Sequence, residues 1–240
     1  MSFKKSLRIQ KILAHLGYGS RRTIEDWIRA GRIKCNDRVA TLGDCVDLSQ
    51  DRLTVDGNLV VKPTQPIQPR LLLYHKPIGE ICSHADPRQR KTIFDTLPSL
   101  LKGRWISIGR LDLNTSGLLL LTNDGDIANK YMHPSRSIER EYAVRVLGKL
   151  TPSNIKNLTH GINLRDGKAR FEHIIEKKAS GVNHWYQVVV MEGRNRIVRR
   201  LFEAQGFLVN RLVRVRFGQL VLPANLKPGK YQELPINTKI

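Results

Sequence analysis

Asp112 is a single carboxylate in a short polar segment directly before a long aliphatic run. The run, 118–121, is four consecutive leucines between Gly117 and the turn-forming sequence 123–125. Such a run is typical of a buried strand. A carboxylate in the loop before a buried strand is rigidly held yet accessible, so it could act as a nucleophile or a base. The alternative is that Asp112 caps a turn or pairs with Arg110.

Two further segments carry side chains suited to chemistry or binding. Tyr142 lies in an alternating segment, 141–147, which predicts a strand. Its ring is either part of a half-buried sheet surface or a flat platform for another ring. The segment 194–216 holds seven arginines and one acid, Glu203. Arginine at this density suits bidentate contacts to phosphate, although unspecific attraction to a polyanion is the alternative.

The charge balance predicts a polyanionic partner. The 240 residues contain 41 Lys and Arg against 21 Asp and Glu, a formal net charge of +20. Nucleic acid is the leading partner, and an anionic membrane surface is the second. No apolar run approaches the ~20 residues of a membrane span, and no signal peptide is expected.

The cysteines and histidines argue against disulfides and metal sites. Cys35, Cys45 and Cys82 are odd in number and widely spaced, which favours a reducing cytoplasm. The seven histidines lack a metal-binding spacing, and no glycine-rich phosphate loop is present. We therefore expect neither a metal nor a nucleotide cofactor.

A proline-rich stretch predicts two domains. Residues 62–70 hold three prolines and one aliphatic side chain, which is typical of an extended linker. We expect a small module over 1–62, a linker over 63–70 and a larger domain over 71–240. In the module, apolar spacing over 9–16 predicts a helix that ends at Gly17. Ser20 is the expected N-cap of a second helix.

Basic side chains gather around this helix pair, and acids are few among them. They form either a solvated surface or, as we favour, an RNA-binding face. The module resembles the S4 RNA-binding domain in the segments 7–13, 19–22, 28–33 and 36–37. That resemblance implies binding of structured RNA rather than chemistry. The basic residues expected to contact RNA are Arg21, Arg22, Arg29, Arg32 and Lys34.

The larger domain reads as α+β. Strands are predicted over 71–75, 141–147, 185–191 and 209–215. Thr151 and Pro152 open a short helix, and 195–205 forms an arginine-rich helix. Strands outnumber helices, so we expect a mixed, largely antiparallel sheet with flanking helices.

Three motifs, in order, resemble the pseudouridine synthases that modify ribosomal RNA. They are 109–120 around Asp112, 139–142 with Tyr142, and 192–204 with Arg199. The segment 132–146 is similar to members that act on the large ribosomal subunit. One position departs from the pattern, because the family usually has glutamine where this chain has Ile197.

The resemblance implies that a uridine in RNA is isomerised without a cofactor or metal. The base is flipped out of the RNA, which costs a few kcal/mol. Asp112 would be the catalytic carboxylate and Tyr142 the platform for uracil. Arg199 would be the counter-charge of Asp112, with Arg110 as the rival by proximity. Attack at C1′, attack at C6 and removal of a ribose proton all stay open. Further RNA contacts are expected from Arg110, Arg140, Arg194, Arg196 and Arg200.

The expected substrate is 23S rRNA near the peptidyl-transferase region, with 16S rRNA or another 23S site as alternatives. We expect a cytoplasmic monomer with no membrane contact. One rival function is a non-catalytic RNA-binding assembly factor. Another is a hydrolase, which would need a second carboxylate or a metal beside Asp112.

Overall fold

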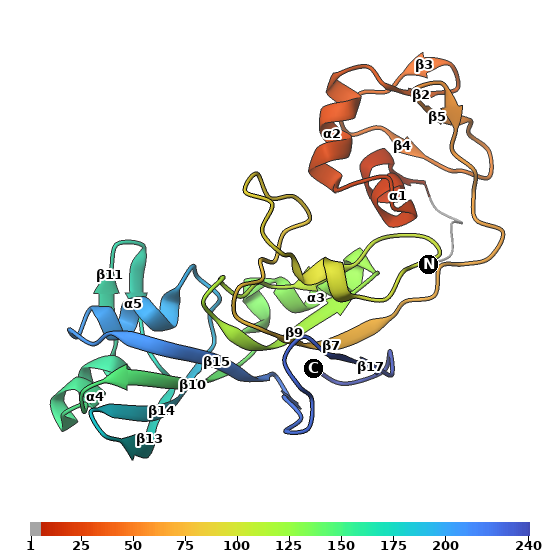
Figure 1. Cartoon of the computed structure of the whole chain (residues 1–240). Coiled ribbons are helices and arrows are strands. Elements are labelled where there is room, and N and C mark those ends of the chain that lie inside the picture. The colour runs from red at the N-terminus through yellow and green to blue at the C-terminus, as the bar shows by residue number, and fades with distance from the viewer. Residues whose placement is uncertain (1–5) are drawn as a thin grey trace. The chain divides into compact units, whose positions relative to one another are not determined.

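The computed structural model describes residues 6–240, with the side chains of Lys178 and Ser180 left aside. The chain forms two compact units (Figure 1). The first holds the chain up to Pro69 together with Pro98–Ile106 and Asn123–Gly125. The second holds Arg70–Leu97, Ser107–Thr122 and Asp126–Ile240.

The first unit packs two helices against short strands. Helix α1 (Ile9–Leu16) ends where Gly17 turns left-handed at φ 95°, and α2 (Arg21–Arg29) begins at Ser20, whose hydroxyl accepts from Thr23 N. Both helix boundaries confirm the sequence prediction. The strands are β1 (Leu7–Arg8), β2 (Ile33–Cys35), β3 (Arg38–Val39), β4 (Cys45–Val46), β5 (Leu53–Val55) and β6 (Asn58–Leu59). Buried aliphatic residues of the helices and strands form the core.

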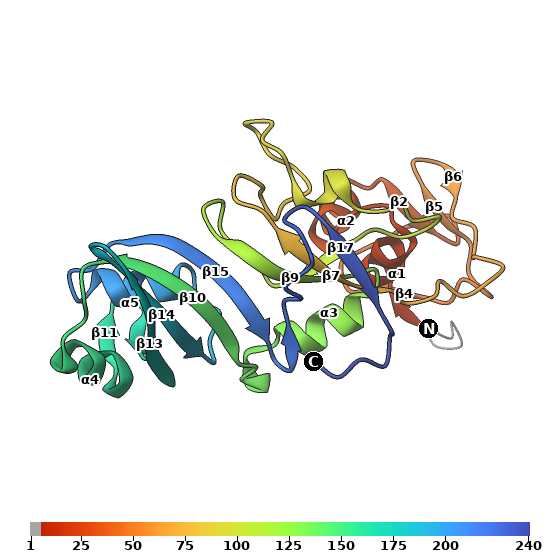
Figure 2. The ribbon, with the colours of Figure 1, turned by 60° about the horizontal axis from the view of Figure 1, so that its bottom comes forward.

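The second unit is built on a sheet with the strand order β13-β14-β10-β15-β9-β7-β17. In addition, β16 pairs with β15 and β8 pairs with β9. Figure 2 shows β10, β13 and β14 curving beside β15. The bounds are β7 (Leu71–Lys76), β8 (Ile106–Ile108), β9 (Ser116–Thr122), β10 (Arg140–Leu147), β13 (His173–Ser180), β14 (Asn183–Val190), β15 (Val209–Phe217), β16 (Leu220–Val221) and β17 (Tyr231–Leu234).

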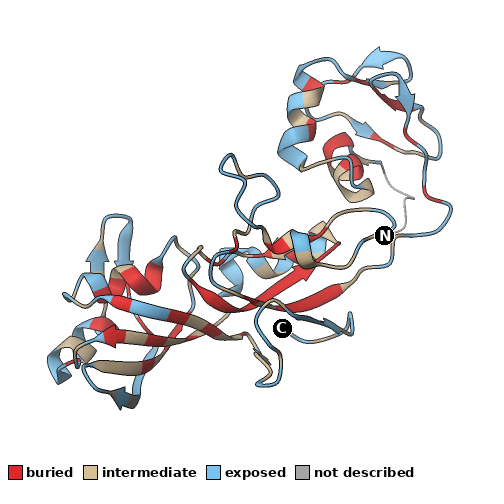
Figure 3. Cartoon of the chain, in the orientation of Figure 1, coloured by how far each residue is buried: buried red, intermediate tan, exposed pale blue. Residues whose placement is uncertain are grey.

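Two antiparallel halves of this sheet meet at β15 and β9. These two strands are parallel and pair through Val213↔Ser116 and Arg214↔Gly117. Gly117 has φ 110°, and a Cβ there would lie 2.2 Å from the Arg214 carbonyl oxygen. Strand β9 is buried along its whole length (Figure 3), which confirms the strand predicted from the leucine run. The glycine is therefore needed where the halves join.

Three helices flank the sheet: α3 (Gly125–Met132), α4 (Pro152–His160) and α5 (Ile197–Glu203). Helix α4 begins with a capping box at Thr151, as the sequence predicts, and contacts β13. Helix α5 contacts β15 and β11 (Ile162–Leu164), the hairpin partner of β12 (Gly167–Ala169). It is shorter than the predicted 195–205 at both ends: it begins at Ile197 because Arg196 has a left-handed backbone with φ 51°, and it ends at Glu203. The fold is α+β, as expected. In the described part of the chain, no helix has the length and apolar character that crossing a bilayer requires.

Candidate active site

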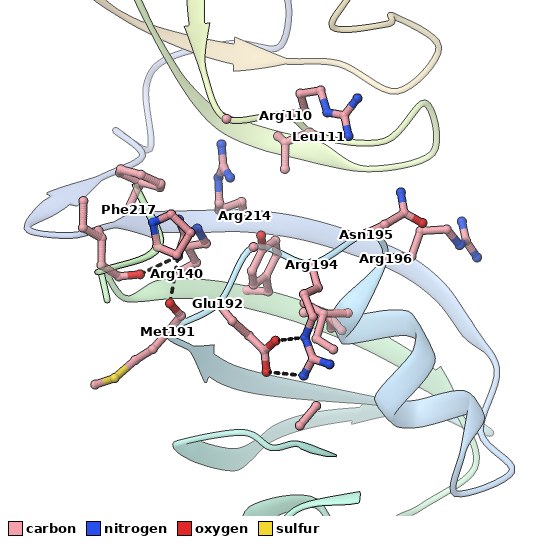
Figure 4. A pocket seen from close by; sticks show the side chains of 18 of the residues that line it. Arg110, Leu111, Arg140, Met191, Glu192, Arg194, Asn195, Arg196, Arg214 and Phe217 are labelled. Atoms are coloured by element: carbon pink, nitrogen blue, oxygen red, sulfur yellow. Dashed lines mark hydrogen bonds and ion pairs between the residues drawn. The ribbon is translucent and has the colours of Figure 1, made fainter. Parts of the chain in front are cut away.

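A cavity of about 1040 Å³ lies within the second unit and is lined by residues of all three motifs (Figure 4). Its walls come from the loop before β9, the start of β10, the segment between β14 and α5, and β15. Asp112 and Tyr142 both line it. Small-molecule pockets measure roughly 300–1,000 Å³, so this cavity has room for a nucleotide.

Backbone hydrogen bonds hold the loop around Asp112, whereas the carboxylate of Asp112 is left without a hydrogen-bond partner in the described chain. Thr115 N donates to the Asp112 carbonyl at 3.0 Å, and Gly79 N donates to the Leu113 carbonyl at 2.9 Å. The Asp112 side chain is half-buried. Within residues 6–240 it forms no ion pair and accepts no side-chain hydrogen bond. The loop thus presents a carboxylate to the cavity without a neutralising partner.

Lys76 lies beneath this loop and was missed by sequence reasoning. Its side chain is 0% exposed, and Nζ donates to the carbonyls of Pro77 (2.8 Å), Asp112 (3.2 Å) and Thr115 (2.9 Å). Burial lowers the pKa of Lys76, while nearby groups that include the Asp112 carboxylate oppose that shift. The available signal was a lone lysine at the end of an apolar strand.

Replacing Lys76 with methionine should loosen the loop. Three backbone carbonyls, two of them in the Asp112 loop, would lose their donor, so we expect the free energy of unfolding to fall by about 2–4 kcal/mol. Urea denaturation measures this change. Lys227→Met is the matched control, because Lys227 is exposed and its loss should stay within about 0.5 kcal/mol. Equal effects of the two changes would contradict a role for Lys76 in holding the loop.

Arg199 contacts the backbone of the Asp112 loop rather than the carboxylate. It is 7% exposed and donates to the carbonyls of Val209 (2.7 Å) and Asn114 (2.9 Å). Among the described residues it makes no ion pair with Asp112, so its role as the counter-charge of Asp112 stays a prediction. Its two terminal nitrogens donate to backbone carbonyls, while its Nε has no partner among the described residues. Burial lowers the pKa of Arg199, and the Asp112 charge counteracts this shift. The two groups therefore interact across a distance.

Tyr142 is fixed in the middle of the sheet. In the sheet, Tyr142 pairs with Val188 of β14 and with Arg214 of β15. The register between β10 and β15 shifts next to Tyr142, between Glu141 and Tyr142. The side chain is 8% exposed and lines the cavity. A rigid strand thus holds an aromatic ring at the cavity wall.

Arg214 is a second cavity residue that sequence reasoning did not single out. It is 2% exposed, and its Nε donates to the Leu118 carbonyl at 2.7 Å. Its guanidinium carbon lies 5.3 Å from the centre of the Phe217 ring. The Arg140 guanidinium carbon lies 5.2 Å from the same ring. A half-buried guanidinium, that of Arg140, and a buried one, that of Arg214, therefore both lie near one aromatic ring in the cavity.

Arg140 and Arg194 line the cavity, and both also donate hydrogen bonds to protein atoms. Arg140 donates to the carbonyls of Ile138 (2.7 Å) and Met191 (3.2 Å). Arg194 pairs with Glu192. It also reaches the turn between β11 and β12, where it meets Asp166 at 3.1 Å. Arg194 thus connects Glu192 to the turn between β11 and β12. Its contact with an RNA phosphate stays a prediction.

The other arginines expected to contact RNA differ in exposure. Arg110 and Arg196 are exposed and line the cavity. Arg196 lies 3.5 Å from Glu203, a long ion pair. Arg200 is outside the cavity lining and pairs with Asp166 at 3.0 Å. Arg110 and Arg196 are the two whose donors are most available to RNA.

Two further carboxylates line the cavity, and both are paired with arginine. Glu192 binds Arg194, and Glu172 lies 3.1 Å from Arg170. Asp112 is therefore the cavity carboxylate without an ion pair among the described residues. Across residues 6–240, His, Cys, Asp and Glu side chains form no group of three suited to a metal ion.

The basic residues predicted on the first unit are partly neutralised. Arg29 pairs with Asp26 at 2.7 Å, and Arg32 pairs with Asp56 at 2.5 Å. Arg21 and Arg22 are exposed at the start of α2, and Lys34 is exposed on β2. These five lie in the first unit and do not line the cavity.

Comparison with known proteins identifies the family. The model of the RNA pseudouridylate synthase family matches residues 70–204. This chain belongs to that family. The S4 domain model matches residues 7–53 of the first unit. A pseudouridylate synthase crystal structure superposes with a TM-score of 0.66 and 28% identity, over 96% of each chain.

Named relatives in the pseudouridylate synthase family are similar along most of the chain. A ribosomal large subunit pseudouridine synthase B of Pseudomonas aeruginosa is 53% identical over 95% of this chain, which spans 59% of that relative. The enzymes of the same name from Vibrio cholerae and Salmonella typhimurium are 50% and 49% identical over 96% of this chain. The chain spans 72% and 80% of their lengths.

Ile197, the departure from the family's motif, is the first residue of α5. It is 5% exposed and lines the cavity. An isoleucine there supplies an apolar wall where an amide would supply hydrogen bonds. Its burial gives the apolar side chain a favourable environment.

Proposed function

We propose that this protein isomerises a uridine of ribosomal RNA to pseudouridine, with Asp112 as the catalytic carboxylate. Membership of the pseudouridylate synthase family supports this reaction. Relatives named for the large ribosomal subunit support 23S rRNA as the substrate. We infer a target near the peptidyl-transferase region, with 16S rRNA or another 23S site as alternatives. The protein would act in the cytoplasm, which suits its three free cysteines, and it would be a monomer.

The observation that carries the proposal is the shared cavity of Asp112 and Tyr142. A flipped uracil on the Tyr142 ring would lie within reach of an unpaired carboxylate. Ionised Asp112 can attack C1′, attack C6 or remove a ribose proton, and we leave these routes open. The arginine partners of Glu172 and Glu192 argue against hydrolysis by paired carboxylates, because a general acid must be protonated.

The remaining residues receive supporting roles in this proposal. Arg199 and Lys76 hold the Asp112 loop through its carbonyls. Arg110 and Arg196 contact the RNA at the cavity. We retain the division into an S4-like domain over 1–62, a linker over 63–70 and a catalytic domain over 71–240.

Mapping pseudouridine in both ribosomal RNAs tests the proposal. Carbodiimide treatment followed by reverse transcription gives a stop at each pseudouridine. A strain that lacks this protein should lose one stop or one local group of stops, most directly in 23S rRNA. Expression of the wild-type protein should restore it. An unchanged map of pseudouridines in both RNAs would contradict the proposal and favour the alternative of a non-catalytic assembly factor.

The S4 domain should supply salt-dependent RNA affinity. Arg22 and Lys34 are exposed and form no ion pair within the described residues. Replacing both with alanine should weaken RNA binding and reduce the slope of log K against log salt by about 1–2. Filter binding at several salt concentrations measures the slope. Arg29→Ala is the control, since Asp26 already neutralises Arg29, and it should change the slope less. An equal change for both variants would contradict this assignment.

A further inference from the structure

Arg214 occupies the row of the sheet that joins the two halves of the proposed active site. It pairs with Tyr142 of β10 on one side and with Gly117 of β9 on the other. Residues opposite each other on neighbouring strands project to the same face. The Arg214 side chain therefore stands beside the Tyr142 ring, next to the strand that follows the Asp112 loop.

The Arg214 guanidinium is fixed, buried and incompletely hydrogen-bonded. Its Nε donates to the Leu118 carbonyl at 2.7 Å, which sets the direction of the group. Its Nη2 is buried and has no partner among the described residues. Figure 4 shows the side chain rising from β15 toward the segment that carries Leu111. A buried donor without an acceptor costs about 1–3 kcal/mol, so such a group in a cavity indicates a place for a ligand's acceptor.

The surroundings of Arg214 favour an electron-rich ligand group. The Arg140 guanidinium lies close to the same Phe217 ring, and no described carboxylate pairs with Arg214. Burial lowers the pKa of Arg140, and the Arg214 charge adds to that effect. Among the described residues, Asp112 is the lining carboxylate without an ion pair. Because the proposed function assigns Asp112 to the ribose or the base, the charges of Arg140 and Arg214 leave a positive region in the cavity that suits a negatively charged ligand group.

We propose that Arg214 is a catalytic residue that donates a hydrogen bond to a carbonyl oxygen of the flipped uracil and stabilises the negative charge that the ring acquires. The inference rests on the proposed function and adds a role to the same cavity. A buried donor that is already oriented needs no reorganisation during the reaction. The hydrogen bond from Arg214 becomes stronger as negative charge develops on the uracil oxygen. It therefore stabilises the transition state more than the bound substrate.

Each route open to Asp112 places charge on a uracil oxygen. If the C1′–N1 bond breaks, its electron pair leaves with N1 and delocalises onto O2 and O4. C1′ then bonds to the Asp112 carboxylate or, after loss of the C2′ proton to Asp112, forms a double bond to C2′. If Asp112 adds to C6, the C5–C6 π pair moves toward O4. In this last case the C1′–N1 bond breaks while the base is held on Asp112 through C6. In every route C5 then bonds to C1′, and Asp112 is released: the Asp112–C1′ bond breaks, the C2′ proton returns, or the Asp112–C6 bond breaks. The C5 proton leaves and N1 gains a proton, which gives neutral pseudouridine.

The test compares two leaving groups in single-turnover reactions. The probes are synthetic RNA hairpins around the mapped target that carry either uridine or 5-fluorouridine. Fluorine withdraws electrons and stabilises the uracil anion by itself. Arg214→Met should slow uridine conversion by about 10²-fold, the usual effect of losing one such donor. With 5-fluorouridine, consumption of the target nucleoside should slow by about 10-fold or less, and RNA affinity should change less than about 3-fold.

Arg211→Met is the matched control, because Arg211 is exposed on the same strand and does not line the cavity. It should leave both rates unchanged. Equal slowing of both substrates by Arg214→Met, or a loss confined to RNA affinity, would overturn the proposal; the latter result would indicate a phosphate contact. If Arg214→Met does not fold, Arg214→Lys and Arg214→Gln replace it. Arg214→Lys, which keeps the positive charge, should then convert uridine faster than Arg214→Gln. The reverse order would count against the proposal. Wild-type protein that makes no pseudouridine in the uridine hairpin would instead refute the proposed function.

Discussion

Asp112→Asn should reduce pseudouridine formation by about 10⁴-fold or more while RNA affinity changes less than about 3-fold. Asparagine keeps the shape of the side chain but can act neither as a nucleophile nor as a base. Asp112 is also the cavity carboxylate without an ion pair in the described chain, so no neighbour stands ready to replace it. Losing one central catalytic group commonly costs this much. Release of tritium from RNA labelled at uracil C5 measures the reaction.

Glu172→Gln is the matched control for this change. Glu172 lines the same cavity but is paired with Arg170 at 3.1 Å. We expect its replacement to slow the reaction by less than about 10-fold, because the proposed mechanism uses one carboxylate. A loss as large as that of Asp112→Asn would contradict a single-carboxylate mechanism and would favour a pair of acids.

Gly117→Ala should damage both stability and activity. The new Cβ would lie 2.2 Å from the Arg214 carbonyl oxygen and 2.6 Å from the Arg214 nitrogen. Strands β9 and β15 would have to separate at one of the two residue pairs that join them. Overpacking and the φ of 110° together should lower the free energy of unfolding by about 2–6 kcal/mol. Urea denaturation and the tritium-release assay measure the two losses.

Gly181→Ala separates backbone strain from the steric clash at Gly117. Gly181 also has a positive φ, 58°, but a Cβ there would meet nothing within 4 Å. Its replacement should cost about 1–2 kcal/mol and leave the rate of pseudouridine formation unchanged. If Gly117→Ala were no worse than this control, the close approach of β9 and β15 would not be what holds the cavity together.

Local patterns in the sequence predicted much of the fold. The leucine run 118–121 predicted a buried strand, and β9 is buried throughout. Ser20 and Thr151 marked helix starts because a side-chain oxygen there satisfies a free backbone N–H. These signals depend on neighbours in the chain, so they can be recognised without a structure.

The parts of the site that depend on long-range contacts could not be predicted. A shift in register near Tyr142 sets which residue of β15 faces it, and no local pattern encodes the pairing with Arg214. Lys76 contacts a loop 36 residues later in the chain. Arg199 was expected as the counter-charge of Asp112, and no local pattern encodes the hydrogen bonds that its terminal nitrogens donate to the carbonyls of Val209 and Asn114. The clustering of Pro98–Ile106 with the first unit likewise follows from contacts far apart in sequence.

The most direct test of the central claim is to incubate purified protein with unmodified 23S rRNA and to measure both pseudouridine content and RNA mass. The account predicts new pseudouridine at one site or one local group of sites. It also predicts unchanged RNA mass, because isomerisation adds and removes no atoms, and no product with Asp112→Asn. Shortened RNA, released uracil, or tight binding without any pseudouridine in 23S or 16S rRNA would contradict it.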